Sequence, residues 1–216
     1  MHHLDEFLIA FQRWIRSKAL LYRLTLGTRL LLAVGFIPTG MVKLLGRRFS
    51  SPETQIGAFF EFLYHSGLYY RFLGLTQVLA GVLVLSSATA TLGALIFFGI
   101  MLNIFVITVS YNFNYTPVIT GPMLLATLYL LLWDYHRLRS IFGLGREQEG
   151  LLAFPPEHQL SGAIERSAYV VGLVSGLGLF SVLRSLFFPY ALQLWFLLGC
   201  LISFLVALWY GLVRRR

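Results

Sequence analysis

Cationic, amide and phenol side chains are spaced along the chain so that several could meet at one depth of a membrane. Lys43 closes one apolar stretch, Arg71 opens the next, and Tyr111 and Asn112 follow a third. Such groups can hold an anion, a quinone or a lipid headgroup, because each can donate a hydrogen bond and two of them carry positive charge. The same residue types also form the aromatic and basic belt at membrane surfaces. The sequence leaves both interpretations open.

Two further amides, Gln77 and Asn103, lie deep inside apolar stretches. Gln77 is 10 residues past Gly67 and Asn103 is 13 residues past Ala90, so at ~1.5 Å per residue both are expected near the bilayer centre. An amide in hydrocarbon needs a partner, and we expect a Gln77–Asn103 hydrogen bond across a helical hairpin. The alternative to ligand binding is a purely structural role for this pair. The predicted ligand-binding set is Lys43, Arg71, Gln77, Asn103, Tyr111 and Asn112.

A second polar pair is expected at the opposite membrane surface. Arg29 lies about one turn inside the first apolar stretch, and Asp134 lies at the end of the fourth. Charges at membrane depth are costly unless they are paired, so the sequence predicts a structural Arg29–Asp134 ion pair. The alternative is that each side chain reaches the membrane surface separately.

No catalytic or metal-binding motif accompanies these residues. Cys200 is the single cysteine, which excludes an intramolecular disulfide and a CxxC pair. The chain has no GxSxG, P-loop or HExxH motif, so no catalytic nucleophile can be named and enzymatic activity stays an open question. The histidines lie outside the interiors of the apolar stretches, so we expect neither haem nor a metal, whereas a bound quinone is compatible with the sequence. These histidines are His2, His3, His65, His136 and His158.

The composition indicates which elements position these residues. The chain of 216 residues is 57% hydrophobic and 12% charged, with a mean hydropathy of +0.75. Soluble domains are about 45–50% apolar and about 25% charged, so the sequence predicts an all-α integral membrane protein in a lipid bilayer. The expected spans are residues 24–45, 67–86, 90–110, 118–133, 169–188 and 191–213.

The remaining segments complete four expected regions. Residues 1–23 alternate apolar and polar side chains at helical spacing, which predicts an amphipathic helix in the membrane interface. Residues 24–140 would form a four-span bundle, with a surface helix within 46–66. Residues 141–168 would form a cytoplasmic linker. Residues 169–216 would form a transmembrane hairpin with a basic tail.

The basic residues predict the orientation of the chain in the membrane. The net charge is +8, from 17 Lys and Arg against 9 Asp and Glu. Nucleic-acid binding is not expected, because most of these residues fall outside the spans or near their ends. Six spans place 11 of them on the side of the termini and 5 on the other, with Arg29 inside the first span, and the positive-inside rule then predicts that both termini are cytoplasmic.

Short motifs in the first four spans resemble the DoxX-like family of small membrane proteins. They are the run from Arg29 through Gly40 to Lys43, the stretch from Gly74 through Gln77 to Gly81, the third-span residues from Thr91 to Asn103, and Trp133–Asp134–Tyr135. The resemblance covers roughly residues 24–140. It implies a four-helix bundle in a bacterial inner membrane and, because some members are associated with thiosulfate:quinone oxidoreductase complexes, a quinone-linked role.

Two departures from the family pattern separate the hypotheses. Many members carry a glutamate where this chain has Gln77, and a neutral amide cannot transfer a proton as a carboxylate does. The hairpin at 169–213 extends beyond the usual four spans. Three hypotheses follow: an accessory or quinone- and lipid-binding subunit of a membrane redox system; a non-enzymatic binder or transporter of a small anion or lipid; and a structural subunit of a membrane complex or a homo-oligomer.

Overall fold

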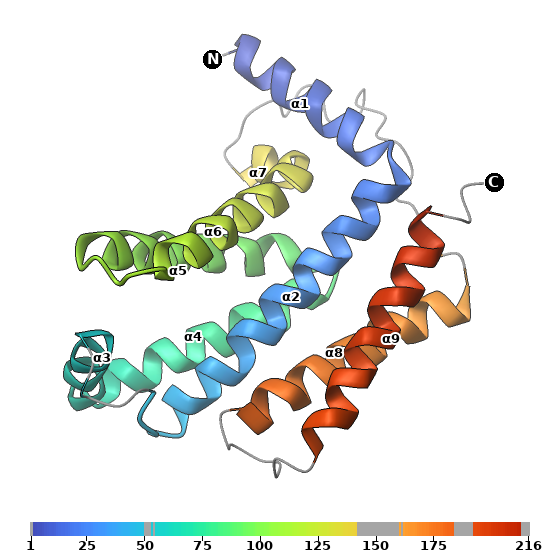
Figure 1. The fold of residues 1–216 in the computed structure, drawn as a ribbon. Coiled ribbons are helices and arrows are strands. Elements are labelled where there is room, and N and C mark those ends of the chain that lie inside the picture. The colour runs from blue at the N-terminus through green and yellow to red at the C-terminus, as the bar shows by residue number, and fades with distance from the viewer. Residues whose placement is uncertain are drawn as a thin grey trace.

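A computed structural model shows an all-α chain. It describes residues 2–49, 53, 55–141, 160, 162–183 and 192–212, and within these ranges it contains helices and no strand (Figure 1). Most of the predicted linker at 141–168 lies outside the described residues. The helices are α1 (His2–Arg16), α2 (Ala19–Leu44), α3 (Gln55–His65), α4 (Leu68–Leu85), α5 (Ala90–Ser110), α6 (Thr116–Trp133), α7 (Tyr135–Ile141), α8 (Ala163–Leu183) and α9 (Gln193–Leu212).

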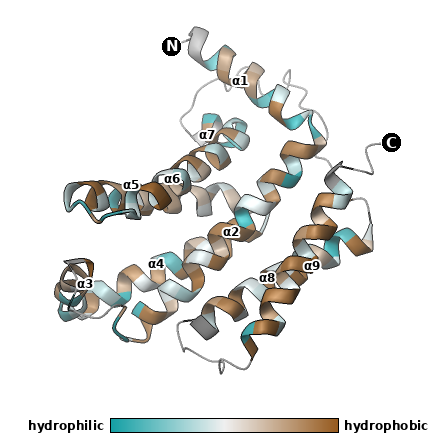
Figure 2. Cartoon of the chain, viewed as in Figure 1, coloured by the Kyte–Doolittle hydropathy of each residue, from teal (hydrophilic) through white to brown (hydrophobic). Residues whose placement is uncertain are grey.

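Six of these helices are long and apolar enough to cross a membrane: α2, α4, α5, α6, α8 and α9. Figure 2 shows hydrophobic residues in brown along α6 and α9, and hydrophilic residues in teal on α1 and α7. The protein is therefore a multi-pass membrane protein whose surroundings are a lipid bilayer. We call the end of the bundle that carries α1 and α7 the α1 side, and the opposite end, with α3 and the α5–α6 turn, the α3 side.

Helix α2 is central to the bundle, between α4 on one side and the α8–α9 hairpin on the other (Figure 1). It crosses α4 at two glycines that allow the backbones to meet. A Cβ atom added to Gly74 would lie 2.6 Å from the Gly40 carbonyl oxygen, and one added to Gly40 would lie 2.8 Å from the Gly74 carbonyl oxygen. Any side chain at either position would push the helices apart, because real Cβ atoms do not approach backbone this closely.

The hairpin of α8 and α9 packs on α2 through small residues of α8. A Cβ atom at Gly176 would lie 2.8 Å from the Val34 side chain of α2, and Gly172 faces Ser203 of α9. These glycines therefore serve helix packing inside the chain. Helix α8 begins at Ala163, ahead of the predicted span start at Tyr169.

The earlier start of α8 has a structural cause in an ion pair. The first turn of α8 places Glu165, which is fully buried, where the Arg23 Nε atom of α2 donates to its carboxylate at 2.7 Å. A buried carboxylate is tolerated when it is paired in this way. This pair ties the C-terminal hairpin to α2 on the α1 side.

Helix α1 is amphipathic as predicted, but it docks on the bundle through a face that includes a polar residue. Ile9, Gln12 and Ile15 are buried, and Gln12 is completely so. Gln12 is one of the polar side chains of the amphipathic pattern, yet in the fold it faces the bundle. Phe7 and Trp14 are exposed instead, at 64% and 57%.

An apolar layer separates the two ends of the bundle. Leu32 and Phe36 of α2 pack there with Val84 of α4 and Phe97 of α5. The Phe36 and Phe97 rings meet edge to face with their centroids 4.6 Å apart, an arrangement that aromatic pairs favour. This layer lies between Arg29 and Lys43 along α2, so the polar groups of the α1 side and the α3 side form two distinct clusters.

Candidate functional site

The α3-side cluster consists of Lys43, Gln77, Phe49 and Phe60, and its centre is a buried lysine. Lys43 is 5% exposed, and its Nζ donates to the Gln77 Oε1 atom at 3.0 Å. Nζ also lies 3.4 Å from the Thr39 carbonyl oxygen of its own helix. This hydrogen bond orients the ammonium group, and because Gln77 is neutral it adds no opposite charge.

Aromatic rings cover the lysine from the α3 side. The Lys43 Nζ atom lies 4.5 Å from the centroid of the Phe49 ring and 5.9 Å from that of Phe60. The two ring centroids are 4.5 Å apart. Ring faces attract a cation, and each such contact contributes about 0.5–2 kcal/mol. The lysine therefore lies beneath an aromatic cover formed by Phe49 and Phe60.

The local sequence explains why these groups meet. The Gly40–Gly74 crossing brings α2 and α4 into backbone contact one turn before Lys43 and Gln77, so the two side chains reach each other. The segment after α2 is held by Tyr70, whose hydroxyl donates to the Arg47 carbonyl oxygen at 2.9 Å. This bond lies between α4 and the segment that carries Phe49.

Other predicted ligand residues lie outside this cluster. Arg71 is exposed, and its guanidinium lies beside Gly46 at the end of α2. Asn112 is exposed and takes a left-handed conformation with φ 50°, which asparagine tolerates and which helps to turn α5 into α6. Tyr111 packs against Phe59 of α3, with ring centroids 5.5 Å apart, and so extends the aromatic cover.

The expected hydrogen bond between Gln77 and Asn103 is not formed. Gln77 faces α2, whereas Asn103 is exposed on the far side of α5 and its Nδ2 lies 3.4 Å from the Gly99 carbonyl oxygen. The prediction is wrong because it assumed that a helical hairpin satisfies its own amides, and Lys43 of a third helix is the partner of Gln77. Asn103 therefore shares no site with Lys43.

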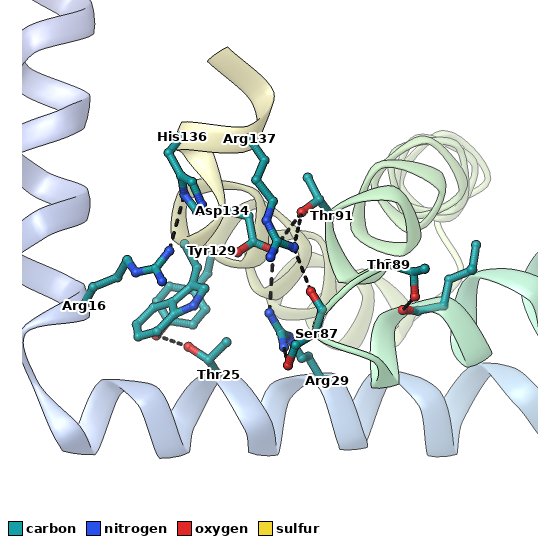
Figure 3. A network of polar contacts seen from close by, with 12 residues as sticks. Arg16, Thr25, Arg29, Ser87, Thr89, Thr91, Tyr129, Asp134, His136 and Arg137 are labelled. Carbon is teal, nitrogen blue, oxygen red and sulfur yellow. Dashed lines mark hydrogen bonds and ion pairs between the residues drawn. The ribbon is translucent and has the colours of Figure 1, made fainter. Parts of the chain in front are cut away.

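The α1-side cluster consists of Arg29, Ser87, Thr91, Asp134 and Arg137 (Figure 3). Asp134 is 4% exposed; its Oδ2 atom lies 3.6 Å from the Arg29 Nη2 atom and accepts from the Thr91 hydroxyl at 3.0 Å. Arg137 donates to the Ser87 carbonyl oxygen at 2.7 Å. These contacts join α2, the α4–α5 turn, α5, α6 and α7, so the cluster closes this end of the bundle around the Arg29–Asp134 ion pair.

Helix α1 extends the α1-side cluster through Gln12. Its Nε2 atom donates to the Trp133 carbonyl oxygen at 2.7 Å and lies 2.7 Å from His136 Nδ1. Its Oε1 atom accepts from the His136 backbone N–H at 3.2 Å. Asp5 also holds α7, through Arg139 at 2.9 Å.

The His136 ring is part of this contact in its neutral form. Burial, with a further contribution from the Arg16 guanidinium, lowers the pKa of His136 to about 4. The Arg16 Nη1 atom lies 3.3 Å from His136 Nδ1 (Figure 3). A neutral Nδ1 can accept a hydrogen bond from Gln12, whereas a protonated one cannot.

Several residues of the two clusters could not be identified from the sequence. Ser87, Thr91 and Gln12 are common polar residues at helix ends or on a helix surface, and they gain importance only through contacts with distant segments. For Glu165 the sequence does indicate a partner, since a lone acidic residue next to an apolar stretch implies a basic residue at the same membrane depth. Phe49 and Phe60 carried no signal beyond their aromatic character.

Comparison with known proteins gives one informative relative. No family model matches the chain, and no solved structure matches it. The uncharacterised protein YwoB of Bacillus subtilis (strain 168) is 32% identical over 123 residues, which cover 53% of this chain and 79% of YwoB. Its name states no activity. The similarity does not show the DoxX-like family, but its identity and coverage establish that the chain belongs to the same family as YwoB.

Proposed function

We propose that this membrane protein binds a lipid-soluble ligand with a carbonyl or anionic oxygen, such as a quinone or a lipid headgroup, at the α3-side cluster. The single observation that carries the proposal is the buried Lys43 ammonium, which is oriented by the Gln77 amide beneath the rings of Phe49 and Phe60. A buried charge is expensive in a membrane and is found mainly where it serves a function.

The chemistry of the cluster favours a flat, oxygen-bearing ligand. The Lys43 ammonium is a multiple donor, which Gln77 Oε1 orients at 3.0 Å and the Thr39 carbonyl oxygen approaches at 3.4 Å. A ligand oxygen would accept a charge-assisted hydrogen bond from the same group, which is about twice as strong as a neutral one. A quinone ring would stack against the aromatic cover, and its isoprenoid tail would extend into the lipid.

Binding within the membrane is favoured over passage across it. A polar path from Lys43 to Arg29 would have to cross the layer of Leu32, Phe36 and Phe97, whose side chains are between 0% and 4% exposed. Asn103, which could have been a step on such a path, faces away from the core. We therefore favour a binding protein or an accessory subunit over a transporter.

The wider setting proposed for this function is a bacterial inner membrane, with both termini in the cytoplasm. The excess of basic residues on the α1 side supports this orientation through the positive-inside rule. The α3-side cluster would then lie near the outer surface. The motif resemblance to DoxX-like proteins supports a role as an accessory subunit of a quinone-linked redox system.

The test is to purify the full chain from bacterial membranes in mild detergent and to quantify extracted quinones and phospholipids by mass spectrometry. We expect one ligand class to be retained at close to one molecule per chain after extensive washing. We expect this retention to fall at least tenfold in Lys43→Met and in Phe60→Leu. A preparation that retains neither quinone nor phospholipid above the level of the variants would overturn the proposal.

A matched control separates loss of the site from loss of fold. Arg71→Met removes a cation from the same end of the bundle, but at an exposed position outside the cluster. It should keep the ligand. Thermal unfolding followed by circular dichroism would establish that the cluster variants keep their helices. Equal ligand loss in Arg71→Met and Lys43→Met would show that retention reflects general surface charge.

A further inference from the structure

Asn103 lies in the membrane-spanning part of the chain with its side chain turned away from the protein. It is 13 residues past the start of α5 and 7 residues before its end. The buried side of α5 carries Ala94, Phe97 and Met101, which are at most 1% exposed. At about 100° per residue, Asn103 falls on the opposite side of the helix.

The environment of Asn103 is apolar on its own helix. Gly99 precedes it by one turn, and Val106 and Ser110 follow it on the same exposed face. We call Gly99, Asn103, Val106 and Ser110 the Asn103 stripe. A Cβ atom added to Gly99 would meet no atom within 4 Å, so this face is open. Within the described part of the chain, the Asn103 side chain makes a long hydrogen bond of 3.4 Å from its Nδ2 atom to the Gly99 carbonyl oxygen.

An amide in this position is poorly satisfied when lipid surrounds it. Asparagine offers two donors and an acceptor, and hydrocarbon provides no partner for them. Interhelical hydrogen bonds from such amides drive helix association in membranes, and a glycine one turn away allows two backbones to approach closely. The stripe therefore has the features of a helix–helix contact, and α4 and α6 pack elsewhere on α5.

We propose that the Asn103 stripe is the interface through which two copies of this chain associate in the membrane. A second copy fits the stripe because all chains insert in the same orientation, so a two-fold axis along the membrane normal places Asn103 of one copy opposite Asn103 of the other at the same depth. The carboxamide is self-complementary: each copy donates from Nδ2 and accepts at Oδ1. Such isologous contacts are the commonest form of association in symmetric dimers.

The dimer is independent of ligand binding at the α3-side cluster. Asn103 and Lys43 point in different directions from different helices, and the apolar layer with Phe97 lies between the stripe and α2. Association through α5 leaves Lys43 and its aromatic cover unchanged. The interface can therefore be tested without any ligand.

The test uses the full chain with Cys200→Ser, reconstituted at low density into bacterial phospholipid vesicles. A cysteine is introduced at Val106 in the stripe, which is 53% exposed, or at Leu125 of α6, which is 65% exposed and serves as the matched control. Under mild oxidation we expect disulfide-linked dimers from Val106→Cys. We expect only the level of random collision from Leu125→Cys. Equal cross-linking at the two positions would overturn the proposal.

Substitutions at the stripe then test the amide itself. The dimerisation constant, measured by energy transfer between labelled chains in the same vesicles, should weaken about tenfold in Asn103→Leu. It should be largely preserved in Asn103→Gln, which keeps the carboxamide. Gly99→Leu should also weaken it, because the added side chain blocks close approach although the monomer has room for it. An unchanged constant in Asn103→Leu would contradict the proposal, and so would a chain that stays monomeric in the vesicles.

Discussion

The two polar clusters lie at opposite ends of α2, and they differ in the kind of partner that each buried cation has. Arg29 on the α1 side lies 3.6 Å from a carboxylate, that of Asp134, which also accepts from Thr91. Lys43 on the α3 side donates to the neutral Gln77 amide and lies under aromatic rings. One cluster pairs opposite charges, while the other orients a positive charge.

This difference separates a structural from a binding role. The Asp134 carboxylate compensates the charge of Arg29, so the α1-side cluster gains cohesion from this pair. An amide offers a dipole and no charge, so the Gln77 contact orients the Lys43 ammonium without neutralising it. The architecture agrees, since the α1-side contacts join five elements and the α3-side cluster lies under a cover of aromatic rings.

The largest expected effect is on the α1 side, where Asp134→Asn removes the charge and keeps the shape. We expect it to lower the free energy of unfolding by about 3–5 kcal/mol, because the buried Arg29 charge loses its counter-ion. Lys43→Met removes the buried cation itself together with its contacts to Gln77 and the aromatic rings, and it should cost less, about 1–2 kcal/mol. Titration with sodium dodecyl sulfate in mixed micelles, followed by circular dichroism, measures both.

A double variant serves as the control for this comparison. Replacing both partners in Arg29→Met/Asp134→Leu should restore most of the stability lost in Asp134→Asn, because no charge is then left without compensation. If Asp134→Asn costs no more than Lys43→Met, the assignment of a structural role to the α1-side cluster is wrong.

The second effect tests how the α3-side cluster is held together. Gly74→Ala should lower the free energy of unfolding by about 1–3 kcal/mol, because its Cβ would lie 2.5 Å from the Leu44 backbone nitrogen. The same separation of α2 and α4 should weaken ligand retention, because Lys43 would move away from Gln77. Gly27→Ala is the control, since its Cβ meets no atom within 4 Å. Equal effects at the two glycines would show that the close approach is unimportant.

The spans could be predicted from the sequence because they depend on a local property. Lipid requires a long apolar helix at each crossing, and this requirement is visible in the composition of any 20-residue stretch. The six predicted spans therefore match six helices, with boundaries that shift by a few residues. The largest shift, at α8, arises from the contact of Glu165 with Arg23, which are far apart in sequence.

The partners of individual polar groups depend on how the helices rotate, and the sequence carries little information on this. Equal depth was sufficient to propose that Arg29 and Asp134 meet, and the structure places them 3.6 Å apart. Equal depth failed for Gln77 and Asn103, because the two side chains leave their helices in different directions. Depth follows from counting residues, whereas direction requires the packed bundle.

The third effect is a dependence on pH at the contact between α1 and the bundle. The pKa of His136, lowered by burial and by Arg16 to about 4, lies below its ordinary value of 6.5. When α1 is detached, the His136 ring takes up a proton near pH 6.5. When α1 is docked, the ring takes up a proton only near pH 4. Docking is therefore fully stable above pH 6.5 and weakens as the pH falls from 6.5 to 4.

Because the His136 ring is only partly buried, solvent screening reduces the loss to about 1–2 kcal/mol. Amide hydrogen exchange of residues 5–16 should accordingly accelerate on acidification within this window, after correction for the intrinsic pH dependence of exchange. His136→Asn retains an acceptor near Gln12 but cannot titrate, and it should give a flat profile. The same acceleration in His136→Asn would exclude the histidine as its cause.

The smallest expected change in stability comes from the substitution that makes the two clusters alike. Gln77→Glu replaces the amide at 3.0 Å from the Lys43 Nζ atom with a carboxylate of the same shape, so the α3 side gains the charge pairing that the α1 side has. Desolvation of the new charge offsets most of the attraction, and the free energy of unfolding should change by less than about 1 kcal/mol. Ligand retention should nevertheless fall about tenfold, because the new carboxylate competes with the ligand for the ammonium group. Gln77→Met, which keeps the ammonium charge and removes the orienting acceptor, should lose less. If Gln77→Glu retains its ligand as the unmodified chain does, the charge of Lys43 is not what the ligand recognises, and the contrast between the two clusters has no bearing on binding.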